Sequence, residues 1–251
     1  IAPATGGHVI TFEDITRQLL DQRRAAWSDV ARRIAHEIKN PLTPIQLATE
    51  RLKRRYGKKL GDDDELFGEL TSTIVRQVGA LRTMVDEFSS FARLPKPVFR
   101  DEDALDLVRQ AVFLQEVAHQ DIAFGLEAPD GKVTLSCDRH QFGQAMTNVL
   151  KNAVEAVQAR GADEGDGFVG AIAVAIEARE DHVDILVSDN GVGLPADRDR
   201  IAEPYVSTRE KGTGLGLAIV SKIVEEHGGD ISFAPVPEGG TRVILRFARS
   251  P

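Results

Sequence analysis

The sequence has little of several features that mark other classes of protein. Cys137 is its only cysteine, which excludes an internal disulfide and a CxxC metal site. No apolar run approaches the roughly 18 residues of a membrane helix, and no signal-peptide core is present. We therefore expect no membrane contact by this chain and a cytoplasmic location for it.

Positive charge is also in short supply. There are 31 Lys and Arg against 39 Asp and Glu, for a net charge of -8. Nucleic-acid binding depends largely on neutralising phosphates, so this balance argues against a nucleic-acid partner. With 251 residues and 42% hydrophobic composition, the chain has room for more than one globular unit.

The first part of the chain predicts one strand and then two long helices. Residues 6–15 (GGHVITFEDI) have the pattern of a single strand, so we assign residues 1–13 to the end of an upstream domain. Residues 14–95 hold two amphipathic helices joined by a polar connector at 56–65. Their apolar stripes are Trp27, Val30, Ile34, Ile38, Ile45, Ala48 and Leu52, then Leu66, Leu70, Ile74, Val78, Leu81, Val85 and Phe88.

A lone helical hairpin leaves much of each stripe exposed to water. We therefore expect an antiparallel two-helix hairpin that forms a homodimer, giving a four-helix bundle. The alternative is that the hairpin packs on a neighbouring domain of the same chain.

Residues 96–251 predict an α+β domain with helices on one face of a largely antiparallel sheet. Pro95 and Pro97 end the second long helix ahead of it. The expected helices cover 103–117, 138–159 and 216–227, and the expected strands cover 122–126, 132–137, 171–176, 182–188, 230–233 and 241–247.

His36 is the first candidate for chemistry, in the segment IAHEIKNPLTP. On a helix it points roughly 160–200° away from Ile34 and Ile38, which predicts an exposed imidazole. Glu37 flanks it, and Asn40 lies on the same face one turn along. An exposed imidazole beside a carboxylate suits a phosphoryl acceptor. Taken alone, an ordinary solvated histidine is the commoner explanation.

The helix expected after Asp138 carries the second candidate set. Asn148, Asn152 and Glu155 share one face at spacings of four and three. Amide oxygens turned toward a ligand suit Mg²⁺ and, through it, phosphate oxygens. In isolation, the polar outer face of a surface helix accounts for the pattern as well.

Two glycine-rich segments follow. Asp189 ends a strand and leads into Asn190-Gly191-Val192-Gly193, which indicates either a hairpin turn or a carboxylate held for an amine such as that of adenine. Residues 212–217 (GTGLGL) open a helix, and the free amides there suit a triphosphate. The segment fits neither a Walker A loop nor a dinucleotide fingerprint.

Together and in this order, these features resemble the sensor histidine kinases of two-component systems over residues 14–247. The matching motifs are HEIKNP at 36–41, the asparagine box at 148–152, the glycine boxes at 189–193 and 212–217, and EPY at 203–205. The flanks at 31–48 and 203–220 are most similar to the nitrogen-regulation kinases of the NtrY type, and HVITFEDIT resembles the last strand of a PAS domain. Ala202, Tyr205 and Arg209 depart from the usual pattern.

The resemblance implies an ATP-binding sandwich of the gyrase, chaperone and histidine-kinase type. It implies that His36 accepts the phosphoryl group, Glu37 acts as general base and Asn40 orients water for a phosphatase reaction. It implies Mg²⁺ held by Asn152 and Asn148. The implied ATP-binding residues are Asn148, Asn152, Glu155, Asp189, Gly191, Gly193, Thr208, Arg209, Lys211, Gly212, Thr213, Gly214, Leu215 and Gly216.

The implied partners are a second copy of the chain and the receiver domain of a response regulator, NtrX-like by the same resemblance. The resemblance is compatible with a parent protein anchored in the inner membrane. Two rival functions are a conformational ATPase of the same nucleotide-binding superfamily and a non-catalytic dimeric signalling scaffold. The ATPases place a catalytic acid where this chain has Asn148, and they lack an exposed histidine on an upstream hairpin.

Overall fold

A computed structural model describes residues 16–57, 64–92, 94–165, 167–194, 214–237 and 239–250, with side chains from Ile34 onward. The strand and PAS-like segment expected before residue 16 lie outside these residues. The chain divides into two compact units, Ile1–Arg93 and Leu94–Pro251. Over the described residues, none of the helices combines the length and the apolar character needed to span a membrane.

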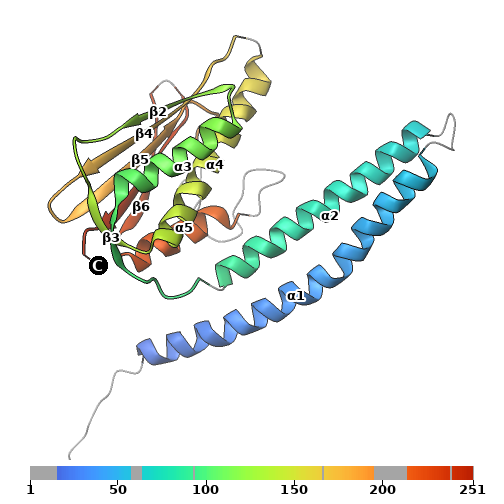
Figure 1. The fold of residues 1–251 in the computed structure, drawn as a ribbon, viewed down its shortest axis with the longest axis horizontal. Helices are drawn as coiled ribbons and strands as arrows, with labels where there is room; N and C mark the ends of the chain where they lie inside the picture. The colour runs from blue at the N-terminus through green and yellow to red at the C-terminus, as the bar shows by residue number, and fades with distance from the viewer. Residues whose placement is uncertain are drawn as a thin grey trace, which may run out of the picture. The chain divides into compact units, whose positions relative to one another are not determined.

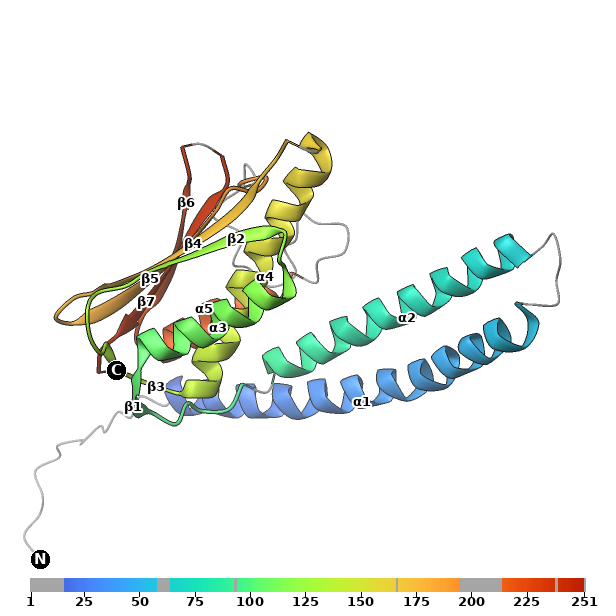
Figure 2. The same cartoon turned by 45° about the horizontal axis from the view of Figure 1, so that its top comes forward.

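The first unit is a helical hairpin. Helix α1 (Thr16–Tyr56) runs for 41 residues, and α2 (Asp64–Ala92) returns alongside it. Figures 1 and 2 both show the two helices side by side, with α1 gently curved. Pro41 and Pro44 lie inside α1, which continues through both as one helix. The two predicted helices are thus present.

The face along which α1 and α2 meet overlaps only in part with the stripes expected from the sequence. Most of the large residues of those stripes from Ile34 onward are exposed, with Ile38 at 41%, Ile45 at 45% and Ile74 at 44%. The buried contact positions are spaced mostly seven residues apart; Val78 and Val85 belong to the expected stripe, and the others do not. The buried positions are Ala35, Leu42 and Thr49 on α1 and Thr71, Val78, Val85 and Ser89 on α2.

The second unit is an α+β domain, which confirms the predicted fold class. A five-stranded sheet has the order β2-β4-β5-β7-β6, and only the β2–β4 pair is parallel. A small sheet pairs β1 with β3. The bounds are β1 (Arg100–Asp103), α3 (Ala104–Ala118), β2 (Ile122–Glu127), β3 (Thr134–Cys137), α4 (Arg139–Glu164), β4 (Gly170–Ala178), β5 (His182–Asp189), α5 (Gly216–Glu226), β6 (Asp230–Pro235) and β7 (Thr241–Ala248).

Helices α3, α4 and α5 cover one face of the five-stranded sheet (Figure 1). The core lies between them, because alternate residues of each strand point to the helices. β7 shows this alternation plainly, with Thr241, Val243, Leu245 and Phe247 buried. The largest fully buried apolar side chains are Phe142, Phe247, Leu135, Met146, Leu150, Ile172, Ile185, Leu215, Ile223 and Leu245.

Two aspartates begin helices of this unit. The Asp103 carboxylate accepts from the Leu105 N–H at 3.1 Å at the start of α3. Asp138 Oδ1 accepts from the N–H groups of His140 and Gln141 at 2.9 and 3.1 Å at the start of α4. Side chains of this kind satisfy backbone donors that a helix leaves unpaired.

The side chain of Gln141 does not complete a capping box with Asp138. It is almost fully buried, and its Nε2 donates to the Pro95 carbonyl at 2.7 Å. Directly after the Lys96-Pro97 pair, the Val98 N–H donates to Asp138 Oδ2 at 2.9 Å. The segment that leaves α2 is therefore held by the start of α4 from Pro95 onward.

A buried histidine supports these contacts between residues 95–98 and the start of α4, which we call the anchor. His227 has no exposed surface; its Nε2 accepts from the Asp138 N–H at 3.0 Å, and its Nδ1 lies 2.7 Å from the Ile223 carbonyl. These partners require Nδ1 to carry the proton and Nε2 to be the acceptor. The ring packs edge-on against Phe99 and Phe247. Burial lowers the pKa of His227, so the neutral form is kept.

Candidate functional site

The exposed histidine of the first unit lies one residue past the buried contact of the hairpin. Ala35 is 2% exposed, whereas His36 and Glu37 both face solvent. Asn40 is exposed one turn further along α1. The structure therefore gathers the three polar residues singled out from the sequence on a surface that a second molecule can reach.

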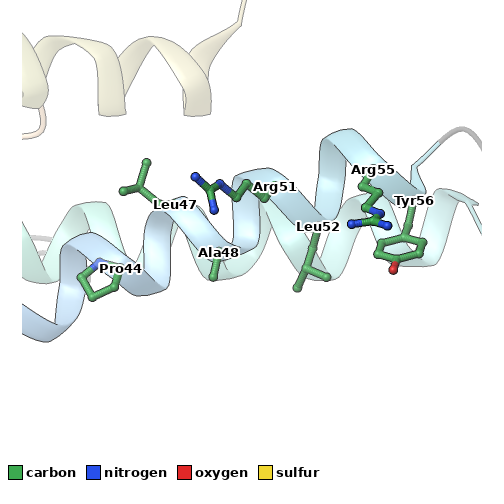
Figure 3. Close-up of a pocket in the computed structure, with 7 residues that line it drawn as sticks. All are labelled: Pro44, Leu47, Ala48, Arg51, Leu52, Arg55 and Tyr56. Atoms are coloured by element: carbon green, nitrogen blue, oxygen red, sulfur yellow. The ribbon is translucent and has the colours of Figure 1, made fainter.

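An apolar groove begins two turns beyond His36 on α1. Its lining residues are Pro44, Leu47, Ala48, Arg51, Leu52, Arg55 and Tyr56, which enclose about 560 Å³. Figure 3 shows Leu47 and Arg51 projecting from the opposite side of the helix to Ala48 and Leu52. Leu47 follows His36 by eleven residues, so it lies only about 20° from it around the helix and roughly 16 Å along it. The groove thus adjoins the His36 face.

In the second unit, Asp189 is fixed at the end of β5. It is 6% exposed, and its Oδ1 accepts from the N–H groups of Gly191 and Thr241 at 2.9 and 3.3 Å. Two backbone donors on one oxygen hold the carboxylate in a single orientation. Among the residues that the structure describes, the next strand after β5 is β6, which follows α5.

The glycines beside Asp189 serve close packing within the protein. A Cβ on Gly191 would lie 2.4 Å from the carbonyl carbon of Ala156, and one on Gly240 would lie 1.9 Å from the Asp189 carbonyl oxygen. The backbone of α4 therefore lies directly against Gly191 on the side where a Cβ would stand. Gly193 (φ +81°) adopts the conformation that favours glycine.

Arg160 and Asn190 hold this strand end, and neither is among the site residues predicted from the sequence. Arg160 near the end of α4 donates from Nη1 to the Asn190 carbonyl at 2.9 Å. Asn190 bonds through both ends of its amide, accepting from the Ala171 N–H at 2.8 Å and donating to the Val169 carbonyl at 2.9 Å. The sequence carried no signal for Arg160, because a cation in the last turns of a helix is expected from the helix dipole alone.

The polar face of α4 joins the strand end to the start of α5. Asn148, Asn152 and Glu155 are half-buried along it, and Asn148 Nδ2 donates to the Gly216 carbonyl at 3.4 Å. At the other end of this face, the Ala156 carbonyl accepts from the Val192 N–H at 3.2 Å. The asparagines and glutamate predicted to act together therefore lie between Asp189 and the second glycine segment.

Helix α5 begins with a left-handed glycine and no side-chain cap. Gly214 has φ +69°, and Leu215, which is buried at the N-cap position, makes no capping hydrogen bond through its side chain. Backbone amides at such a helix start carry partial positive charge and can bind an anion. Of the glycine segment expected to bind phosphates, Gly214, Leu215 and Gly216 are described here.

Helix α4 sets the length of the candidate site between Val192 and Gly216. The residues that contact Gly216 and Val192, Asn148 and Ala156, are eight positions apart, or about 12 Å along the helix. That separation suits a nucleotide laid along α4, with its base at the Asp189 end and its phosphates at the Gly216 end. The amide oxygens of Asn148 and Asn152 lie along this path, and they are the hard donors that Mg²⁺ prefers.

The remaining predicted site residues fall outside the described residues. They are Thr208, Arg209, Lys211, Gly212 and Thr213. Within the described part of the chain, no group of three or more His, Cys, Asp or Glu side chains could hold a metal ion. Cys137 is not a candidate metal ligand or nucleophile. Its burial, with the nearby Glu102 carboxylate, raises the pKa of its thiol to about 12, so the thiol stays protonated.

Two protein families match the two units. Residues 26–97 match the His Kinase A (phospho-acceptor) domain, and residues 137–251 match the histidine kinase-, DNA gyrase B- and HSP90-like ATPase family. The first match contains His36. The second contains Asn148, Asp189 and Gly216.

The chain is similar to longer curated proteins. It is 54% identical over 238 residues to the nitrogen regulation protein NtrY of Azorhizobium caulinodans, covering 94% of this chain and 30% of that protein. It is 38% identical over 241 residues to a putative sensor histidine kinase, NtrY-like, of Rickettsia prowazekii, covering 94% and 39%. This chain thus spans about a third of the length of these relatives.

A solved structure shares the arrangement of elements. The histidine kinase ThkA, in complex with the response regulator protein TrrA, matches with a TM-score of 0.66 and 25% sequence identity. The match covers 96% of this chain and 69% of that chain.

Proposed function

Because the chain belongs to the sensor histidine kinases of two-component systems, we propose that it transfers the γ-phosphoryl group of ATP to its own His36 and then to an aspartate of a response regulator. The observation that carries this proposal is the α4 arrangement, in which Asp189, the asparagines and the start of α5 line one nucleotide-sized path. The exposed imidazole of His36 supplies the acceptor.

The path along α4 supports ATP as the phosphoryl donor. The fixed carboxylate of Asp189 accepts a hydrogen bond from the amine of adenine, and the backbone amides at the start of α5 contact the phosphates. Asn152 and Asn148 hold Mg²⁺, which neutralises charge on the phosphate oxygens when bound. Glu155 lies on the same face and contributes to the polar wall.

The segment between the two glycine boxes completes the binding site in this proposal. Thr208, Arg209 and Lys211 supply a hydroxyl and two positive charges for the phosphates, and Gly212 and Thr213 belong to the same glycine-rich segment as Gly216. Phosphoryl transfer depends mostly on positioning and on neutralising charge, so the two cations lower the barrier.

His36 then acts as the nucleophile. One ring nitrogen attacks the γ-phosphorus in line, and the nitrogen–phosphorus bond forms as the bond to the bridging oxygen breaks. The electron pair of that bond leaves with ADP. The proton on the other ring nitrogen passes to Glu37, the adjacent exposed carboxylate, which acts as general base. The product is a phosphohistidine.

A response regulator removes this group. A carboxylate oxygen of its aspartate attacks the phosphorus, and the bond to the imidazole breaks. The groove that adjoins the His36 face, with Leu47 and Arg51, gives the regulator a surface to dock on. The regulator is NtrX-like, on the similarity to NtrY. Asn40, one turn from His36, orients water for the phosphatase reaction, in which the water attacks the phosphorus of the regulator's aspartyl phosphate and inorganic phosphate leaves.

A second copy of the chain covers the exposed stripes of the hairpin. Large apolar residues on both helices are 41–55% exposed in one chain, among them Ile38, Ile45, Leu52, Leu70 and Leu81. Their seven-residue spacing at Ile38, Ile45 and Leu52 is typical of a helical bundle seam. The proposed assembly is a homodimer with a four-helix bundle.

Labelling with ATP that carries ³²P at the γ position tests the proposed function. The kinase gives protein label that is stable to alkali and labile to acid, and the His36→Gln variant loses it. Free phosphate without labelled protein would instead indicate a conformational ATPase. Neither product would indicate a scaffold that works by dimerisation.

A further inference from the structure

An ion pair joins the two helices of the hairpin close to His36. Lys39 Nζ on α1 contacts Asp86 Oδ1 on α2. Both side chains are partly exposed, at 36% and 50%. An ion pair this open to water contributes little to stability, so its partners exchange readily.

Lys39 is also a neighbour of His36. The two residues are three positions apart on one helix, about 60° around the axis and 4.5 Å along it. Among the α1 side chains that the structure describes, from Ile34 on, Lys39 is the first cation after His36. Its four-carbon stem lets the ammonium swing from α2 toward the imidazole.

We propose that Lys39 binds the phosphoryl group carried by His36, and that Asp86 competes with this group for the lysine ammonium. The inference rests on the proposed function of His36 as the phosphoryl acceptor. Before transfer, Asp86 neutralises Lys39 and holds it at the edge of the hairpin. After transfer, a group with about two negative charges and three acceptor oxygens lies within reach of Lys39 and displaces the single carboxylate.

The two members of the pair therefore act in opposite directions. Removing the charge of Lys39 takes away a ligand of the phosphoryl group, which makes phosphohistidine less stable relative to ATP. Removing the charge of Asp86 frees Lys39 and makes phosphohistidine more stable. If the pair served only to join α1 to α2, both changes would break the same contact and would act alike.

The test is the equilibrium between ATP with histidine and ADP with phosphohistidine. The full chain is incubated with Mg²⁺ and fixed ratios of labelled ATP to ADP until the phosphorylated fraction is constant. We expect Lys39→Gln to lower the equilibrium constant about threefold to tenfold and Asp86→Asn to raise it about twofold. Lys39→Arg keeps the charge and restores most of the wild-type value.

Two further variants separate this role from general effects. Lys53 also donates from α1 to α2, through Ser72 Oγ at 2.9 Å, but it lies roughly 25 Å along the helix from His36. Lys53→Gln should leave the equilibrium constant unchanged. In the Lys39→Gln background, Asp86→Asn should have no further effect, because Asp86 acts through Lys39.

Each outcome either supports or overturns the inference. Opposite effects of Lys39→Gln and Asp86→Asn, with the second lost in the double variant, support the inference. A fall in both single variants, no change in Lys39→Gln, or an Asp86→Asn effect that persists without Lys39 overturns it while leaving the kinase intact. No label on the wild-type chain overturns the proposed function itself and the inference with it.

Discussion

The anchor at the start of α4 makes a quantitative prediction for Asp138→Ala. The carboxylate caps α4 through the N–H groups of His140 and Gln141 and holds the segment after α2 through the Val98 N–H. Loss of an N-cap costs about 1 kcal/mol, and loss of a hydrogen bond to a carboxylate costs a similar amount. We expect the unfolding free energy of residues 94–251 to fall by about 2 kcal/mol.

Asp103→Ala is the matched control. Asp103 Oδ1 caps α3 through the Leu105 N–H and accepts from the Val133 N–H at 3.3 Å, so it makes the same kinds of contact. It does not touch the segment from Pro95 to Val98. The two variants should therefore lose similar stability, while only Asp138→Ala releases that segment.

Native-state amide hydrogen exchange on the full chain measures both effects together. Core amides of β5 report global unfolding, and the Val98 amide reports opening of the anchor. Asp138→Ala should speed exchange at Val98 well beyond the global change, and Asp103→Ala should not. Equal exchange at Val98 in the two variants would refute the anchor.

Three further predictions concern other parts of the molecule. Because burial lowers the pKa of His227, the unfolded chain binds a proton on this histidine at a higher pH than the folded chain does. Urea titrations should show that the contribution of His227 to the free energy of unfolding is fully present above about pH 6.5 and is lost as the pH falls below that value. The His227→Gln variant should show a weaker dependence of stability on pH. Ile45→Glu places a charge on the exposed α1 stripe, so analytical ultracentrifugation should show at least a tenfold weaker dimer, roughly 1.4 kcal/mol or more. Gly191→Ala forces a Cβ against Ala156 and should lower the melting temperature through a loss of about 1–3 kcal/mol, whereas Gly143→Ala, with open space around it, should not.

The sequence predicted the elements of the fold better than their contacts. Periodicity located α1 and α2, but it could not say which face meets the partner helix. The large residues such as Ile45 mark an apolar surface whatever covers it. Ala35 and Thr49 bury more easily against α2 because small side chains let two helices approach closely. An uncovered stripe of large residues then remains for a second chain.

Strand β1 shows a limit of a different kind. Its sequence, Arg100–Asp103, is RDED, with no apolar residue and hence no alternation to recognise. It becomes a strand because it pairs with β3 from Arg100 to Asp103 against Cys137 to Thr134. Tertiary pairing of this sort overrides local propensity.

In the candidate site, too, the sequence predicted some residues and missed others. Short motifs located Asp189, Asn148 and Gly216, because each stands in a recognisable local pattern. Arg160 and Gly240 were missed, since their roles depend on approach to β5 from distant parts of the sequence. A pattern identifies a side chain that faces a ligand more readily than one that supports it from behind.

Locating the phosphate on the wild-type chain tests the central claim most directly. After incubation with ATP and Mg²⁺ at alkaline pH, fragmentation mass spectrometry should place a single phosphoryl group on His36, and Asp189→Asn should abolish it. Phosphate found on any of the other histidines, or on His36 at an unchanged level in the Asp189→Asn chain, would contradict the account.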